Sequence, residues 1–198
     1  KDVNEYALST GFDVSTASFT DSFSVAAEIT APSGLCFNPD GTKMFILDFN
    51  YDARDVSEYT LSTGFDVSTS SYVDSFSMGS QDTSPMGIAF NADGTTMFMV
   101  GNDVDNVNTY TLTTGFDVST ASFTSAFSVA AQDTVPKGIA FNSDGLKMYI
   151  VGTSNDSVFE YSLGTFSTVN QMDKTQLDAV TDPNHIALSN DLDLAIVL

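Results

Sequence analysis

The sequence has few residues that could carry covalent, redox or zinc chemistry. Its 198 residues include one cysteine, one histidine and no tryptophan. A single cysteine excludes a disulfide within the chain, and Cys36 lies in an apolar stretch without a histidine or basic neighbour that would lower its thiol pKa. One histidine is a weak metal signal and leaves no constrained Ser-His-Asp set. We therefore expect Cys36 to be a buried structural thiol.

Basic residues are also scarce. Six Lys and Arg stand against 26 Asp and Glu, which gives a net charge of −20. Such a surface repels nucleic-acid phosphates and anionic lipids, so neither is an expected partner. The negative charge attracts cations or suits a saline medium, and a solubilising coat is its simplest interpretation.

Long apolar runs are absent as well. No stretch approaches the ~20 apolar residues of a membrane helix, so no membrane insertion is expected. The first six residues, Lys-Asp-Val-Asn-Glu-Tyr, are not a signal peptide and already belong to a repeat. We interpret the sequence as a mature product or a piece of a longer one.

What the sequence does contain is internal repetition. The pattern Val-x-x-Tyr-x-Leu begins at Val3, Val56, Val107 and Val158, in steps of 53, 51 and 51 residues. Gly-Phe-Asp-Val-Ser-Thr occurs letter for letter at 11–16, 64–69 and 115–120. Such identity indicates duplication of one unit. We predict a single domain over 1–198, with repeat units of about 3–55, 56–106, 107–157 and 158–198.

Each unit predicts four short β-strands, and no segment shows a sustained helical period. An apolar strand such as 87–90 leads through an Asn-x-Asp-Gly turn into a second apolar strand such as 97–100. The Val-x-Glu-Tyr-x-Leu strand alternates apolar and polar residues, and the fourth strand, such as 18–25, has the polar pattern of an outer edge. The aspartates predicted to form turns are Asp13, Asp40, Asp66, Asp93, Asp117 and Asp144.

Four antiparallel strands per repeat are typical of a β-propeller, whose blades bury their faces against one another. The chain begins with the third and fourth strands of a unit and ends with the first and second. We therefore expect an all-β propeller of four blades, with the first blade closed by strands from both termini. Residues 187–198 would then pair with residues 3–25. The alternative is a larger ring completed by further chain or by a second subunit.

The segments 85–94 and 136–145, Pro-Met-Gly-Ile-Ala-Phe-Asn-Ala-Asp-Gly and Pro-Lys-Gly-Ile-Ala-Phe-Asn-Ser-Asp-Gly, resemble the YVTN-type β-propeller repeats. That family has a Pro-x-Gly-apolar-apolar-Phe-x-x-Asp-Gly strand followed by an apolar strand and a short polar turn. The resemblance extends through all four copies. It implies a propeller fold of the kind found in surface-layer and other extracytoplasmic proteins, and also in lactonase-like enzymes.

Propeller topology places the loops before the first strand and after the second strand of each unit on one face. This face collects carboxylates, and we predict it as an acidic ligand-binding face. A hard cation such as Ca²⁺ takes several oxygen ligands, so a metal would bind at Asp82, Asp133, Asp103 and Asp105. No EF-hand spacing is present, and a solvated acidic rim is the simpler interpretation. The predicted ligand-binding residues are Glu28, Asp82, Asp133, Asp182, Asp103, Asp105 and Asp156; the same loops hold Asp48, Asp52 and Asp55.

His185 stands where the other units have the glycine of their first strand, so we expect it at the channel mouth with a packing or closure role. The lactonase-like relatives imply metal ligands on the inner strands. Here the inner strands carry Gly, Ile, Ala, Phe and Cys, without an acid. We therefore predict no catalytic residues and no cofactor, apart from the calcium option.

The sequence favours a non-catalytic, secreted or cell-surface propeller that acts as a structural or binding module in adhesion or surface assembly. Near-identical repeats present one surface several times, which suits multivalent contacts with a glycan, a protein surface or copies of the chain itself. The alternatives are a metal-dependent lactonase-like hydrolase and a lectin-like glycan-binding propeller.

Overall fold

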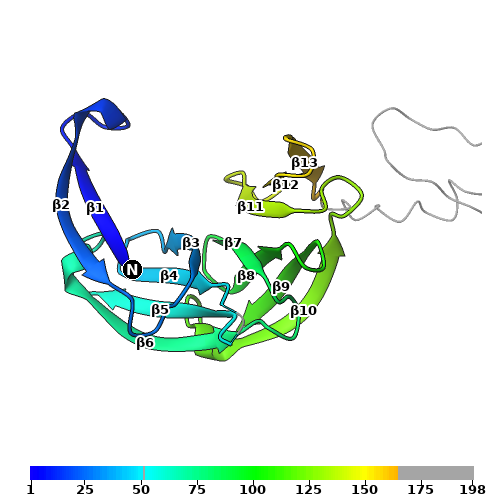
Figure 1. The fold of residues 1–198 in the computed structure, drawn as a ribbon, viewed down its shortest axis with the longest axis horizontal. Helices are drawn as coiled ribbons and strands as arrows, with labels where there is room; N and C mark the ends of the chain where they lie inside the picture. The colour runs from blue at the N-terminus through cyan, green and yellow to red at the C-terminus, as the bar shows by residue number, and fades with distance from the viewer. Residues whose placement is uncertain (51, 165–198) are drawn as a thin grey trace, which may run out of the picture. The chain divides into compact units, whose positions relative to one another are not determined.

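Antiparallel strands and tight turns make up the part of the chain that the structure describes (Figure 1). This computed structural model describes residues 1–50 and 52–164, and Lys1–Leu163 form one compact unit. Within these residues there is no α-helix, and so none that could span a membrane. Three short 3₁₀ turns occur at equivalent places in the repeats: η1 (Val14–Thr16), η2 (Val67–Thr69) and η3 (Val118–Thr120).

The strands form four separate sheets, each built from consecutive strands. The first is the pair β1 (Asp2–Leu8) and β2 (Ala17–Ser24). The second holds β3 (Pro32–Phe37), β4 (Lys43–Asp48), β5 (Asp55–Leu61) and β6 (Ser70–Ser77). The third holds β7 (Pro85–Phe90), β8 (Thr96–Gly101), β9 (Asn106–Leu112) and β10 (Ala121–Ser128). The fourth holds β11 (Pro136–Phe141), β12 (Lys147–Gly152) and β13 (Val158–Ser162).

The predicted strand order is confirmed in the two complete sheets. Neighbours pair in the order β3-β4-β5-β6 and β7-β8-β9-β10, so the apolar strand is innermost and the Ser- and Phe-rich strand is at the outer edge. Both outer strands carry a register shift, between Tyr72 and Asp74 in β6 and between Phe123 and Ser125 in β10. Such bulges bend an edge strand and protect it from pairing with another chain.

Consecutive sheets pack through their inner strands, which explains the glycine in β3 and in β7. β3 contacts β7, and β7 contacts β11. A Cβ on Gly34 would lie 2.9 Å from the carbonyl oxygen of Met86, and one on Gly87 would lie 3.0 Å from that of Lys137. Only glycine lets the backbones approach so closely. The Ser33 hydroxyl also donates to the Pro85 carbonyl across this contact at 2.8 Å.

The described core divides into three clusters, one at each junction between consecutive sheets. Met44 and Ile46 of β4 face the first sheet and pack with Val25 and Ile29, whereas Phe45 and Leu47 face the third sheet. Val100, Val107, Met148 and Ile150 fill the junction between the third and fourth sheets. The apolar residues on both faces of β4 therefore reflect a sheet covered on both sides, as the sequence predicted.

The predicted turn formers occupy the predicted turns. Gly41, Gly94 and Gly145 have φ of 71°, 72° and 71° at the first hairpin of their sheets. Asp40 accepts the Thr42 N–H at 3.0 Å and Asp93 accepts the Thr95 N–H at 3.0 Å. Cys36 packs against the core, and burial raises its thiol pKa to about 12, so the thiol is protonated at neutral pH.

The expected closure of the ring involves residues outside the described part. Residues 187–198, Asp182 and His185 all lie beyond residue 164, so the pairing of both termini, the four-blade count and the single domain over 1–198 stay predictions. Within the described residues, the first and fourth sheets are incomplete versions of the two central ones.

The repeated loop offers a matched test of this packing. A Cβ on Gly64 would collide with the carbonyl oxygen of Asp40, whereas Gly11, at the same position of the same hexapeptide, has no atom within 4 Å of such a Cβ. Gly64→Ala should therefore lower the free energy of unfolding by about 1–3 kcal/mol, as overpacking does, and Gly11→Ala should leave it nearly unchanged. Chemical denaturation of the two variants measures the difference, and equal effects would contradict the loop packing described here.

Candidate functional site

The acidic face predicted from the sequence contains carboxylates that are buried and engaged with the backbone. Asp48, Asp82 and Asp133 are almost completely inaccessible to solvent. Asp48 accepts the Ala31 N–H at 3.0 Å, Asp82 accepts the Ser84 N–H at 2.7 Å, and Asp133 accepts the Val135 N–H at 2.7 Å. These three N–H groups are equivalent in the repeats, each directly preceding the proline of an inner strand. We call this carboxylate and its N–H partner the loop brace.

The brace is supplied from two different places in the sequence. In the third and fourth sheets the aspartate belongs to the loop before the inner strand, and glycine (Gly101 or Gly152) ends the second strand. A Cβ on either glycine would overlap the neighbouring carboxylate. In the second sheet the arrangement is exchanged, because Asp48 ends the strand and the apolar Ile29 takes the loop position. One carboxylate therefore fits between loop and strand in each of these three sheets.

This exchange makes a sharp prediction. Asp82→Ile should leave the half-buried Ser84 N–H without its acceptor, at a cost of about 1–3 kcal/mol in unfolding free energy. Gly101→Asp should place two carboxylates in one space and destabilise the fold by about the same amount. The double variant reproduces the Ile29–Asp48 arrangement and should recover most of the loss. A double-mutant cycle in urea measures the coupling. Simple additivity of the two losses would contradict the shared role.

The other predicted carboxylates lie in the same loops with different surroundings. Glu28 accepts the Tyr59 hydroxyl at 3.4 Å, and Asp103 accepts the Thr83 hydroxyl at 2.7 Å. Asp105 directly precedes β9 and has a φ of 54°, and Arg54, which directly precedes β5, has a φ of 52°. Asp156 lies two residues before β13 and has a φ of 47°. The carbonyl of Asp105 accepts the Val129 N–H at 2.8 Å, as that of Arg54 accepts the Met78 N–H. These positions are therefore turn positions as well as acidic ones.

The electrostatics of this face do not by themselves define a metal site. Burial, and then the charges of Asp82, Asp133 and Asp103, raise the pKa of Asp105 above its usual value. The negative charges thus influence one another. Yet within residues 1–50 and 52–164 no group of three or more His, Cys, Asp or Glu side chains is placed to hold a metal ion.

A second set of polar contacts, which the sequence interpretation missed, joins one sheet to the next. It involves the Gly-Phe-Asp-Val-Ser-Thr segments at 11–16, 64–69 and 115–120, which we call the junction loops. The Val118 N–H donates to Oε2 of Glu58 at 3.0 Å, and the Val67 N–H donates to Oε2 of Glu5 at 2.9 Å. In each case the glutamate belongs to the preceding sheet. Lys43 bridges Glu58 and the carbonyl of Phe116, both at 2.7 Å.

Four residues of the junction loop have an identifiable structural role. The glycine passes close to the first hairpin, and the phenylalanine has a φ near 60° and places its ring against that hairpin's glycine, as Phe116 does on Gly94. The aspartate caps the 3₁₀ turn by accepting the N–H two residues later, as Asp117 does from Ser119. The valine is buried in the two inner copies, Val67 and Val118. The sequence contained a signal for the Lys–Glu contact. Lys43 occurs together with Glu58, and Lys147 together with Glu160. In the third sheet both positions are changed together, to Thr96 and Thr109.

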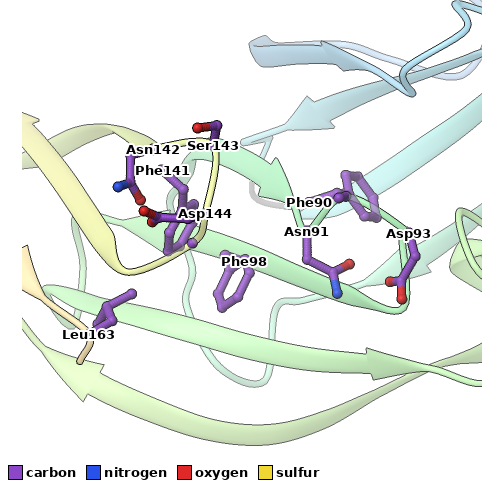
Figure 2. A pocket seen from close by; sticks show the side chains of 11 residues that line it. Phe90, Asn91, Asp93, Phe98, Phe141, Asn142, Ser143, Asp144 and Leu163 are labelled. Atoms are coloured by element: carbon purple, nitrogen blue, oxygen red, sulfur yellow. The ribbon is translucent and has the colours of Figure 1, made fainter. Parts of the chain in front are cut away.

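A pocket lies beside the third and fourth sheets (Figure 2). It has a volume of about 380 Å³, with Phe98 and Phe141 as its apolar floor and Asn91, Asp93 and Asn142 at its edge. At the preceding junction the equivalent residues are Phe45 and Phe90, and there the ring of Phe116 packs on both, with ring centroids 6.2 and 5.5 Å apart. The pocket is thus the space that a junction-loop phenylalanine occupies one repeat earlier. It is an aromatic socket with a polar edge that includes two carboxylates, Asp93 and Asp144.

Comparison with known proteins gives structural likeness without a sequence family. No family model and no curated protein matches the chain. Among solved structures, one is a candidate 6-phosphogluconolactonase from Bacteroides fragilis NCTC 9343, with a TM-score of 0.58 and 13% identity, covering 81% of this chain and 44% of that one. Another is a candidate 6-phosphogluconolactonase from Bacteroides uniformis ATCC 8492, with a TM-score of 0.55 and 12% identity over 82% and 47%. A protein of unknown function from Desulfotomaculum acetoxidans DSM 771 has a TM-score of 0.54 and 17% identity over 80% and 44%.

These comparisons and the sheet arrangement define the class of the protein. It is an all-β protein with a β-propeller-like fold, built from antiparallel sheets of consecutive strands that pack through their inner strands. At identities of 12–17% the likeness concerns the fold alone. The chain spans less than half the length of these solved structures.

Proposed function

We propose that the protein is a non-catalytic β-propeller module, secreted or at the cell surface, that acts in adhesion or surface assembly. The observation that carries this proposal is the composition of the inner strands. β3, β7 and β11 present Ser, Gly, Leu, Cys, Met, Ile, Ala, Lys and Phe, and no His, Asp or Glu, between their prolines and final phenylalanines. A metal-dependent hydrolase needs acidic or histidine ligands that converge on a reacting group.

The acidic loops support the same proposal. The carboxylates with the deepest burial, those of Asp48, Asp82 and Asp133, already bind backbone N–H groups as loop braces. Their negative charge then serves the fold, and the remaining exposed acids give the −20 chain a strongly anionic surface. Such a surface favours partners that are neutral or basic, such as a glycan or a protein face, over nucleic acid or anionic lipid.

Repetition supports a binding role over a single active site. In the first three sheets, an aromatic residue of the outer strand forms a T-shaped pair with a tyrosine of the neighbouring strand. These pairs are Tyr6–Phe19, Tyr59–Tyr72 and Tyr110–Phe123, with ring centroids 5.8, 5.7 and 5.9 Å apart. Phe19, Tyr72 and Phe123 are each at least 40% exposed. Exposed rings of this kind stack on sugar or protein surfaces, and several weak contacts in one molecule raise the total affinity.

The competing candidate is a lactonase-like hydrolase, because two of the structural neighbours are candidate 6-phosphogluconolactonases. We expect the purified chain to show no hydrolysis of 6-phosphogluconolactone above the uncatalysed rate, with or without Ca²⁺, Mg²⁺, Mn²⁺ or Zn²⁺. We also expect no tight Ca²⁺ binding by isothermal titration calorimetry. Metal-dependent turnover would overturn the non-catalytic proposal, and micromolar Ca²⁺ affinity lost in Asp105→Asn would establish the calcium site instead.

A binding assay tests the positive half of the proposal. The chain should bind a glycan or protein surface measurably in an array or pull-down, and Phe123→Ser should weaken that binding if the outer aromatic rings are the contact. Cys36→Ser, at a half-buried position of the inner strand β3, is the control for destabilisation, because it perturbs the packing without changing the outer strand. Equal weakening by both variants would contradict a role for the outer rings.

A further inference from the structure

The junction between the second and third sheets shows what a complete sheet-to-sheet joint contains. Glu58 is 2% exposed and accepts the Val118 N–H, Lys43 binds the Phe116 carbonyl, and the Phe116 ring lies near Phe45. The joint therefore has two halves. One half is the junction loop. The other half is the Lys–Glu pair on the second and third strands of the preceding sheet, together with the aromatic residue that pairs with the glutamate, which is Phe45 in this joint.

In the first sheet the junction loop is present, but the described residues provide no preceding sheet for it to pack against. The junction loop at 11–16 has the same letters as those at 64–69 and 115–120. It also has the same conformation, since Phe12 has φ 61° and Asp13 caps η1 through the Ser15 N–H at 3.0 Å. Yet Phe12 is fully exposed and Val14 is 80% exposed, whereas Val67 and Val118 are buried. The loop is preformed for docking without being docked, which lowers the ordering cost of binding.

In the fourth sheet the Lys–Glu pair is present and is also exposed. Lys147 binds Oε1 of Glu160 at 2.7 Å, the separation found for Lys43 and Glu58. The strand register is the same, because Tyr149 pairs with Glu160 as Phe45 pairs with Glu58. The side chains of Lys147 and Glu160 are 44% and 47% exposed, against 27% and 2% for Lys43 and Glu58.

We propose that the loop at 11–16 of one copy docks on the Lys147–Tyr149–Glu160 edge of a second copy. In this joint the Val14 N–H donates to Glu160, the Lys147 ammonium donates to the Phe12 carbonyl, and the Phe12 ring packs beside Tyr149. The inference deepens the proposed function, on which it rests, by naming the partner and the contact for surface assembly.

Two observations favour a second copy as the occupant. Within one chain the loop and the edge are both solvent-exposed, so they do not satisfy each other there. The two halves are also complementary in kind, because the loop with the same letters at 115–120 docks on the equivalent Lys43–Glu58 pair at the junction between the second and third sheets. Because the two halves lie on different surfaces, the contact is head-to-tail, which gives a closed ring or an open filament.

The chain offers variants that separate the two halves. Sedimentation velocity over 1–200 µM, an ordinary range for weak assembly, should show concentration-dependent association of the 198-residue chain. Phe12→Ser and Glu160→Gln should each weaken the association at least tenfold. Phe49→Ser, at an aromatic residue that is 42% exposed, and Asp144→Asn, at another exposed acid, are the matched controls and should associate as the original chain does. Circular dichroism verifies that each variant is folded.

Complementation gives the sharpest outcome. The Phe12→Ser chain keeps an intact edge and the Glu160→Gln chain keeps an intact loop, so a mixture of the two should form a 1:1 complex although neither associates alone. A peptide with the sequence of residues 9–17 should compete with association, and the same peptide with serine in place of phenylalanine should not.

The outcomes that overturn the inference are distinct from failure of the proposed function. A chain that stays monomeric at every concentration, as single-chain ring closure requires, overturns the second-copy joint. So does association that the two variants leave unchanged, or a mixture that does not complement. A monomer that binds a glycan and hydrolyses no lactone would leave the proposed function standing, whereas an associating chain with lactonase turnover would overturn only that function.

Discussion

Packing of each sheet against the next is the constraint on which the rest of this structure depends. A single four-stranded sheet buries little by itself, because its apolar residues project from both faces. Each described core cluster is therefore shared by two sheets, and residues such as Met44 and Phe45 serve different junctions although they are neighbours in sequence. The glycines of the inner strands and the glutamates of the third strands act on the same contact, one by permitting close approach and the other by binding across it.

The two polar devices of the fold use carboxylates for structural purposes. In the loop brace, a buried aspartate accepts an N–H that would otherwise be unsatisfied, and the residue can come from either side of the space it fills. In the joint, Glu58 satisfies a backbone N–H of the next sheet while Lys43 balances its charge. A strongly acidic composition thus includes carboxylates that hold the repeats together, along with others that only cover the surface.

This division of roles bears on function. The described residues that looked like convergent ligands in the sequence are distributed among braces, turns and rim positions, and the pocket beside the third and fourth sheets has the composition of a joint. What remains exposed and repeated is aromatic and loop surface, which suits association more than chemistry. A propeller-like array with one loop and one Lys–Glu edge exposed has the two complementary surfaces that head-to-tail assembly needs.

The sequence by itself determined the repeat, the four-strand unit and the strand order, because these depend on local pattern and turn chemistry. Asn-x-Asp-Gly requires a residue with positive φ at a hairpin, and the Ser- and Thr-rich stretch 122–128 fits an edge strand whatever lies beyond it. The packing of Cys36 against the core followed from its apolar neighbours for the same reason, although the residue is half-buried and not fully buried as predicted.

Only the tertiary structure decided which carboxylates are free to act. Asp82 and Asp105 are both acidic loop residues, but one lies under Gly101 as a brace and the other holds a turn beside it. The hydrogen bond from the Val118 N–H to Glu58 joins residues 60 positions apart. Local pattern carries no information on such a contact, because it arises from the packing of one complete sheet on another, which brings distant backbone groups within hydrogen-bonding distance.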